Sequence, residues 1–140
     1  MILDTSVISE AISVRPDQMV MKWFATLDRK LLCVPSVVKA ELLAGVAFLP
    51  AGRRSEVLGA MITEFLESYE NERILAFESA DAPFYAEVLS SRRSAGRPVS
   101  ILDAQIAAIA LRRGLPVATR NVRDFADCGV TLINPWDPAP

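Results

Sequence analysis

The stretch Ser100-Ile-Leu-Asp-Ala-Gln-Ile-Ala-Ala-Ile-Ala-Leu-Arg-Arg-Gly-Leu-Pro-Val-Ala-Thr119 decides the fold class of this 140-residue chain. Ser100 can cap an unusually apolar helix over residues 101–113, and Gly114 stops that helix. The next apolar run, residues 116–119, has the composition of a buried strand. A helix followed closely by a buried strand is typical of an α/β protein with a parallel sheet.

The same alternation extends along the whole chain. Further short apolar runs predict strands at residues 1–3, 31–34, 74–77 and 130–133. Helical spacing predicts helices at residues 7–12, 16–27, 36–49, 53–69 and 79–94. We therefore predict one α/β domain over residues 1–136, with a five-stranded parallel sheet flanked by helices on both faces. Residues 137–140 are expected to form a short C-terminal tail.

The composition limits the class of protein and the cellular compartment that we expect. Hydrophobic residues make up 51% of the chain and charged residues 23%, an ordinary globular profile with a net charge of −2. No apolar run reaches membrane-spanning length, and the opening segment lacks a basic leader. Cys33 and Cys128 match no metal-binding or redox spacing. We expect a cytoplasmic protein with no membrane contact and two buried thiols.

The chain contains no histidine, and this excludes several kinds of catalysis. Serine–histidine and cysteine–histidine nucleophile systems need an imidazole, as does histidine-ligated zinc. Two cysteines are too few for a thiolate zinc site. Any catalysis must therefore use carboxylates, hydroxyls, amides and cations.

Three acids interrupt otherwise apolar elements, and each also has a purely structural interpretation. Asp4 ends the first predicted strand, where it could simply cap a helix. Asp103 lies in the apolar helix, where Ser100 and Asp103 could form a capping box. Glu41 is expected to be half-buried, because its helical neighbours are apolar, although it could reach water from the helix edge. These neighbours are Val37, Val38, Ala44 and Gly45.

Together the three acids suggest a metal site. Parallel sheets bind their ligands at the carboxyl ends of the strands, where the fold can gather all three side chains. Clustered like charges repel unless a cation neutralises them. Oxygen-only ligands favour Mg²⁺ or Mn²⁺, and such an ion can activate water and stabilise charge on a phosphoryl group.

The segment after the fourth strand supplies candidates for a further position. Asn121 could ligate a metal or position water through its amide. Asp124 could be an outer acid, or it could cap a helix or pair with Arg120. Both interpretations of Asp124 stay open at this point.

Several motifs in order carry a resemblance to a known family. They are Met1-Ile-Leu-Asp-Thr-Ser-Val-Ile-Ser-Glu10, Val38-Lys-Ala-Glu-Leu-Leu-Ala-Gly45, Ser100-Ile-Leu-Asp-Ala-Gln-Ile-Ala-Ala108, Ala118-Thr-Arg-Asn-Val-Arg-Asp-Phe125 and Val130-Thr-Leu-Ile-Asn-Pro-Trp136. Across essentially the whole chain, they resemble the PIN-domain family. The likeness is greatest to the VapC and FitB-like toxins of bacterial toxin–antitoxin pairs.

The resemblance implies a Mg²⁺-dependent endoribonuclease on a PIN-like domain. The acids matching Asp4, Glu41 and Asp103 would hold the metal, and Asn121 or Asp124 would complete the catalytic cluster. The expected partners are an RNA substrate and a cognate antitoxin that occludes the site. A homodimer is also expected, as is operator DNA bound only through the antitoxin complex.

Two residues depart from the family pattern. Ser6 stands where the family usually has Asn, and Asn121 stands where an Asp is common. Within the expected reaction, Thr5, Ser6 or Thr119 would position solvent around the metal. Arg97 and Arg120 are the arginines expected to contact RNA phosphates.

Two rival functions use similar residues. A metal-dependent phosphatase or receiver domain also uses aspartates and Mg²⁺. Such phosphatases need a second Asp where Ser6 stands, and receivers need a lysine near the fifth strand, whereas the chain's lysines are Lys22, Lys30 and Lys39. The other rival is a partner-binding module that keeps the PIN fold without catalysis. Cleavage of DNA in place of RNA also stays open.

Overall fold

The computed structural model describes residues 1–69 and 71–137. The strands are β1 (Ile2–Leu3), β2 (Val34–Pro35), β3 (Ile74–Leu75), β4 (Val117–Ala118) and β5 (Leu132–Ile133). The α-helices are α1 (Thr5–Ala11), α2 (Gln18–Ala25), α3 (Ser36–Ala47), α4 (Arg53–Glu67), α5 (Ala82–Ser94) and α6 (Ile101–Arg113). Short 3₁₀ turns are η1 (Arg29–Leu31), η2 (Asn71–Arg73), η3 (Ser79–Asp81) and η4 (Val122–Phe125). The predicted α/β class is confirmed.

The predicted single five-stranded sheet is wrong in one respect. The described strands are all parallel, but they form a three-stranded sheet, β1-β4-β5, and a two-stranded sheet, β2-β3. An isolated bridge between Ile2 and Cys33 joins the two, with the Leu3 N–H donating to the Cys33 carbonyl at 2.9 Å. Pro35 would be the next donor along this edge, and it has no N–H. The ladder between β1 and β2 therefore ends after one bridge.

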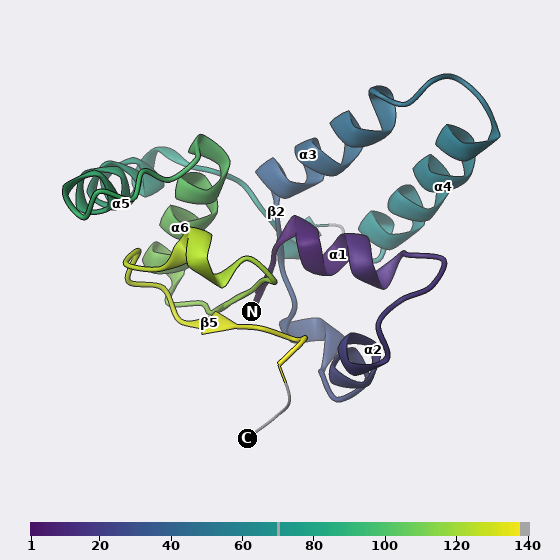
Figure 1. Ribbon diagram of the computed structural model, residues 1–140, viewed down its shortest axis with the longest axis horizontal. Coiled ribbons are helices and arrows are strands. Elements are labelled where there is room, and N and C mark those ends of the chain that lie inside the picture. Colours follow the sequence, from purple (N-terminus) through teal and green to yellow (C-terminus); the bar gives the residue numbers. More distant parts are fainter. Residues whose placement is uncertain (70, 138–140) are drawn as a thin grey trace.

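The helices lie on two sides of the strands, as predicted. In Figure 1, α5 and α6 lie to the left, whereas α1 to α4 lie to the right. The order of the strands explains this division. The chain steps from β1 to β2 to β3 in one direction and then returns past β1 to β4. Since parallel crossovers are right-handed, a reversal of direction moves the connecting helices to the opposite face.

Helix ends follow the capping residues closely. Asp17 caps α2, and the Ser100 hydroxyl accepts the Asp103 N–H at 3.1 Å at the start of α6. Gly114 ends α6 in a left-handed conformation with φ of 63°. Helix α3 has no side-chain cap, because Pro35 holds the cap position and Ser36 is the first helical residue.

The core lies around β1, β4 and α6. Both residues of β1 and both of β4 are buried, as are the central residues of α6 from Ile106 to Ala110. Cys128 is buried, as predicted, whereas Cys33 is only half-buried, and both thiols are free. Among the described residues, no helix combines the length and apolar character needed to cross a bilayer. Of the predicted C-terminal tail, residues 138–140 lie outside the described part.

Candidate active site

A cleft of about 340 Å³ lies where β1 and β4 end and where α1 and α6 begin. It contains every acid that the sequence singled out, together with Asn121. Neither lysine nor arginine is among the residues that line it. The lining residues are Asp4, Thr5, Ser6, Glu41, Ser100, Leu102, Asp103, Asn121 and Asp124.

Asp4 is the most firmly held acid of the cleft. It is buried, with 5% of its surface exposed, and one carboxylate oxygen caps α1 by accepting the Thr5 N–H at 2.8 Å. The other oxygen accepts hydroxyl hydrogen bonds from Ser6 at 3.0 Å and Thr119 at 2.7 Å. The capping interpretation is thus correct, and the same side chain also lines the cleft.

The hydroxyls of Ser6 and Thr119 tie Asp4 to the segment after β4. Ser6 Oγ accepts the Arg120 N–H at 3.1 Å, and Thr119 Oγ1 accepts the Asn121 N–H at 3.0 Å. Each hydroxyl therefore donates to Asp4 and accepts from a backbone amide. This arrangement fixes the carboxylate of Asp4 and the start of the Asn121 loop relative to one another.

Glu41 reaches the cleft, but the expected half-burial is wrong, because its side chain is exposed. Thr5 Oγ1 donates a hydrogen bond to Glu41 Oε2, joining α1 to α3. The apolar residues of α3 do not form one buried stripe, since Leu42 is buried while Leu43 and Phe48 are exposed. The sequence argument failed because it assumed that all apolar residues of the helix face the core.

Asp103 shows that the acids of the cleft influence one another. Burial raises the pKa of its carboxyl group, and the negative charges of Asp4, Asp124 and Glu41 raise it further, against the opposing effect of Ser100. The side chain is half-buried at the first turn of α6. The cleft is therefore a place where negative charge accumulates.

The donor chemistry fits a hard divalent cation. Carboxylate, hydroxyl and amide oxygens are the groups preferred by Mg²⁺ and Mn²⁺, and this cleft offers no nitrogen or sulfur ligand typical of zinc. Within residues 1–69 and 71–137, no three acidic or cysteine side chains are close enough to form a ready-made metal group. The residues fit such an ion by donor type.

The two arginines expected to contact RNA lie outside the lining of the cleft. Arg97 pairs with Asp127 at 3.3 Å. Arg120 lies over the ring of Trp136 at 5.1 Å, and among the described residues it forms no ion pair with Asp124, which was one of the alternatives left open by the sequence. Asp124 itself sits in η4 and faces the cleft.

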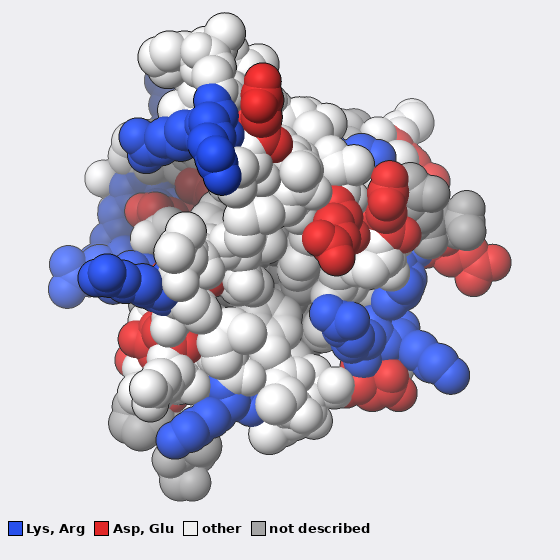
Figure 2. Space-filling model, turned by 90° about the vertical axis from the view of Figure 1, so that its right-hand side faces the viewer, with Lys and Arg blue, Asp and Glu red and all other residues white. Residues whose placement is uncertain are grey.

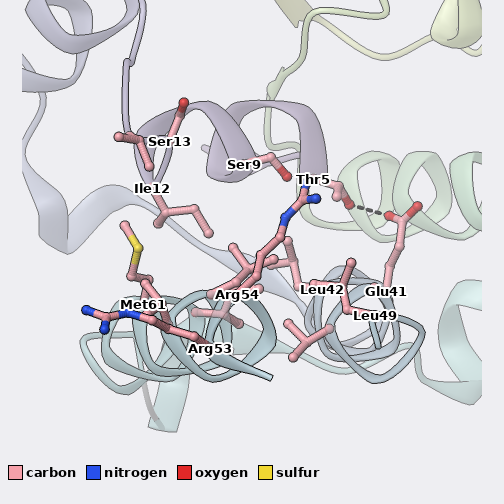
Figure 3. Close-up of a pocket in the computed structure, with 16 residues that line it drawn as sticks. Thr5, Ser9, Ile12, Ser13, Glu41, Leu42, Leu49, Arg53, Arg54 and Met61 are labelled. Carbon is pink, nitrogen blue, oxygen red and sulfur yellow. Dashed lines mark hydrogen bonds between the residues drawn. The ribbon is translucent and has the colours of Figure 1, made fainter. Parts of the chain in front are cut away.

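A second hollow, which the sequence did not reveal, adjoins the cleft. This groove of about 930 Å³ lies between α1 and the α3–α4 hairpin. Its walls are mostly aliphatic, and Thr5 and Glu41 line both the groove and the cleft. Figure 3 shows Arg54 extending from α4 toward Ser9 and Thr5 of α1. Figure 2 views the molecule from the side of these helices and shows a largely uncharged central band with acidic and basic side chains around it.

Comparison with known proteins matches almost the whole chain. The PIN domain model matches residues 1–129. The chain is 38% identical to the plasmid stability protein StbB of Pseudomonas syringae pv. tomato, covering 97% of this chain and 98% of that protein. It is 33% identical to the VapC ribonuclease Y4jK of Sinorhizobium fredii, covering 99% of both chains. It is also 33% identical to toxin FitB of Neisseria gonorrhoeae, covering 96% of this chain and 97% of that protein.

Among solved structures, the fold is similar to that in FitAB bound to an IR36 DNA fragment. The TM-score is 0.92 at 32% identity, and the match covers 99% of this chain and 97% of that chain. The similarity therefore includes the strands, the helices and the segment that carries Asn121 and Asp124.

Proposed function

This chain belongs to the PIN-domain family, and from that premise we propose that it is a Mg²⁺- or Mn²⁺-dependent endoribonuclease, the toxin of a toxin–antitoxin pair. One observation carries the proposal. Asp4, Glu41 and Asp103, which come from three separate segments of the chain, line one cleft together with Asn121 and Asp124. The names of the similar proteins, a ribonuclease and a toxin, support the same function.

The acids have distinct places in the proposed reaction. Asp4, Asp103 and Glu41 would hold the ion, which lowers the pKa of water and neutralises charge on the phosphodiester. Ser6 and Thr119 keep the Asp4 carboxylate in one orientation through their hydrogen bonds. Thr5 does the same for Glu41.

The remaining two groups of the cleft act on water and substrate. Asp124 is exposed at the rim of the cleft. We propose that its carboxylate accepts the proton that water releases when it attacks phosphorus. The amide of Asn121 can orient the attacking water or a phosphate oxygen. Proton transfer to a carboxylate is consistent with a site that has no histidine.

The groove beside the cleft gives the antitoxin a place to bind. Its walls contain aliphatic side chains from α1, α3 and α4, which suit the apolar face of a bound segment. Because Thr5 and Glu41 are shared, a segment seated there also covers one side of the cleft. We expect operator DNA to be bound by the complex and not by the free toxin, consistent with the net charge of −2.

The deciding experiment is cleavage of a mixed RNA pool by the purified protein without its partner. Reactions contain Mn²⁺, Mg²⁺ or chelator and compare the wild type with Asp103→Asn, using Asp137→Asn as an exposed control. We expect metal-dependent cleavage by the wild type and the control, and loss of at least 100-fold in Asp103→Asn. Full cleavage by Asp103→Asn, or cleavage in chelator, would contradict the proposal.

The alternative function is a non-catalytic PIN module, because Ser6 and Asn121 depart from the family pattern. Calorimetric titration with Mn²⁺ separates the two functions, since a site without catalysis has no need to bind the ion. A matched single-stranded DNA pool in the same assay distinguishes ribonuclease from deoxyribonuclease activity.

A further inference from the structure

Arg92 is a buried arginine whose recorded hydrogen bonds all go to backbone carbonyls. Only 5% of its surface is exposed, although its neighbour Arg93 on α5 lies in solvent. Its Nη1 donates to the carbonyls of Arg123, at 3.2 Å, and Ala126. Its Nε is buried and has no hydrogen-bond partner among the described residues. Burial of a guanidinium is costly, so the contacts it makes must matter to the fold or to the function.

Two neighbours of Arg92 hold the same segment. Ser91 Oγ donates to the Asp127 carbonyl at 3.5 Å, and Arg97 pairs with the Asp127 carboxylate at 3.3 Å. Asp127 adopts a φ of 61°, the one left-handed non-glycine conformation in the described chain. Such a conformation costs about 1–2 kcal/mol and persists where surrounding contacts enforce it. Contacts from Ser91 and Arg92 of α5, and from Arg97 just beyond its end, therefore hold residues 123–127 in place.

The segment held in this way carries part of the candidate site. Asn121, just before η4, and Asp124, within it, line the cleft. Around this turn the Asp124 N–H donates to the Asn121 carbonyl at 3.0 Å, the Ala126 N–H to Arg123 at 3.4 Å and the Cys128 N–H to Phe125 at 3.2 Å. A single 3₁₀ turn is marginal alone, so its position depends on contacts with the rest of the fold. The Asn121 N–H bond to Thr119 and the buried ring of Phe125 hold its start and middle, and the contacts from Arg92 hold the carbonyls of Arg123 and Ala126.

We propose that Arg92 is a positioning residue, which holds residues 121–127 against α5 so that Asn121 and Asp124 face the carboxylate cleft. The inference rests on the proposed function for the role of the cleft, but the contacts between Arg92 and the segment do not depend on that function. Arg92 touches neither substrate nor ion and acts only through the backbone of the segment. Arginine suits this task because one guanidinium nitrogen, Nη1, donates to both carbonyls, and because the guanidinium is less strongly hydrated than an ammonium group and so is less costly to bury.

The test uses the full chain with Arg92→Met and Arg92→Lys. Arg93→Met is the matched control, since it removes the same charge from an exposed position on the same helix. Urea unfolding first establishes that each variant is folded. Amide hydrogen exchange then measures the opening of residues 121–127, calorimetry measures Mn²⁺ affinity, and the RNA-pool assay measures Mn²⁺-dependent cleavage.

We expect Arg92→Met to speed exchange at least tenfold in residues 121–127, with the amides of α6 unchanged. Its Mn²⁺-dependent cleavage of the RNA pool should fall about 10- to 100-fold, while its Mn²⁺ affinity stays near the wild-type value, because the segment carries Asn121 and Asp124 and not the three acids that would hold the ion. Arg92→Lys should lie between this variant and the wild type, and Arg93→Met should match the wild type. If Arg92→Met does not fold, Arg92→Lys carries the same comparison.

The inference would be overturned by unchanged exchange, by exchange that rises across the whole chain, or by unchanged RNA cleavage once the segment has loosened. Failure of the proposed function is distinguishable. In that case the wild type neither binds Mn²⁺ nor cuts RNA, while the exchange pattern still reports whether Arg92 holds the segment.

Discussion

Asp103 carries a charge that its surroundings disfavour, since burial and three neighbouring acids raise the pKa of its carboxyl group. The folded protein therefore holds this proton more tightly than the unfolded chain does. In the absence of metal, the resulting destabilisation is absent at low pH. It grows as the pH rises from the ordinary Asp range through the raised folded pKa.

We predict that Asp103→Asn unfolds at a higher urea concentration than the wild type at pH 7 in chelator. The difference should vanish near pH 3, where the wild-type carboxyl is protonated. Added Mn²⁺ should stabilise the wild type and not the variant. Equal midpoints at pH 7 in chelator would mean that the acids of the cleft do not repel one another measurably.

For single residues, the sequence predicted which acids lie together in the cleft but not how buried each one is or which groups it contacts. Asp4 and Asp103 interrupt apolar elements, and both lie in the cleft. The exposure of Glu41 and the burial of Arg92 were not predictable. A glutamate among apolar residues suggests burial, and an Arg-Arg pair suggests a solvated helix face. In each case the partner that decides the outcome lies far away in the sequence.

At the scale of elements, a charged latch joins the start of α5 to the end of α6. Asp81 is fully buried in η3 and binds Arg112 and, at 3.0 Å, Arg113, while the more exposed Glu78 binds Arg112. Burial alone would raise the pKa of Asp81, but the hydrogen bonds and charges of the two arginines, with the backbone of Glu78, hold it below its ordinary value.

We predict that Asp81→Ala destabilises the protein by about 3–5 kcal/mol at pH 7, because it leaves two arginines without their buried partner. The control Arg97→Ala removes an exposed ion pair with Asp127, worth about 1 kcal/mol or less. Because the folded pKa of Asp81 is lowered, its stabilisation is complete above the ordinary Asp range. It is lost as the pH falls through the folded pKa. Urea unfolding at pH 7 and pH 3 should show the difference in stability between the wild type and Asp81→Ala narrowing as the pH falls below the ordinary Asp range.

Helices were easier to predict than strands for a physical reason. A helix is closed by local groups such as Asp17, Ser100 and Gly114, which can be read directly from the sequence. A strand exists only through its partner. The predicted strands of about four residues are two residues long in the structure, and the missing N–H of Pro35 divides the sheet. Pairing of distant segments is not visible in apolar runs.

At the scale of the whole molecule, the net charge of −2 bears on how the proposed RNA substrate would be bound. A chain with a net negative charge is expected to contact few phosphates. With Arg97 and Arg120 as the contacts, the logarithm of RNA affinity should fall with the logarithm of salt with a slope of about −1.4, since each phosphate contributes about −0.7.

The prediction can be checked by fluorescence anisotropy of single-stranded RNA with Asp103→Asn, which prevents cleavage, at fixed Mn²⁺. Arg120→Gln should reduce the slope by about 0.7, and the exposed control Arg15→Gln should leave it unchanged. A slope that Arg120→Gln does not alter would remove Arg120 from the RNA-binding surface.

The groove between α1 and the α3–α4 hairpin could not be predicted, because the sequence does not separate apolar residues of a core from those of an open wall. Its side chains come from three helices, and only the fold brings them together.

Thr5 and Glu41 form a wall common to the groove and the cleft, and this has a consequence for chemical control of the protein. A small apolar compound bound deep between α3 and α4 would displace a protein partner from the groove. It would leave the acids of the cleft accessible, so it would act as an activator. The same compound extended by one cationic group to Glu41 would evict the partner and obstruct the acids together. Whether such a compound activates or inhibits the protein would therefore depend on whether its substituent is long enough to reach Glu41.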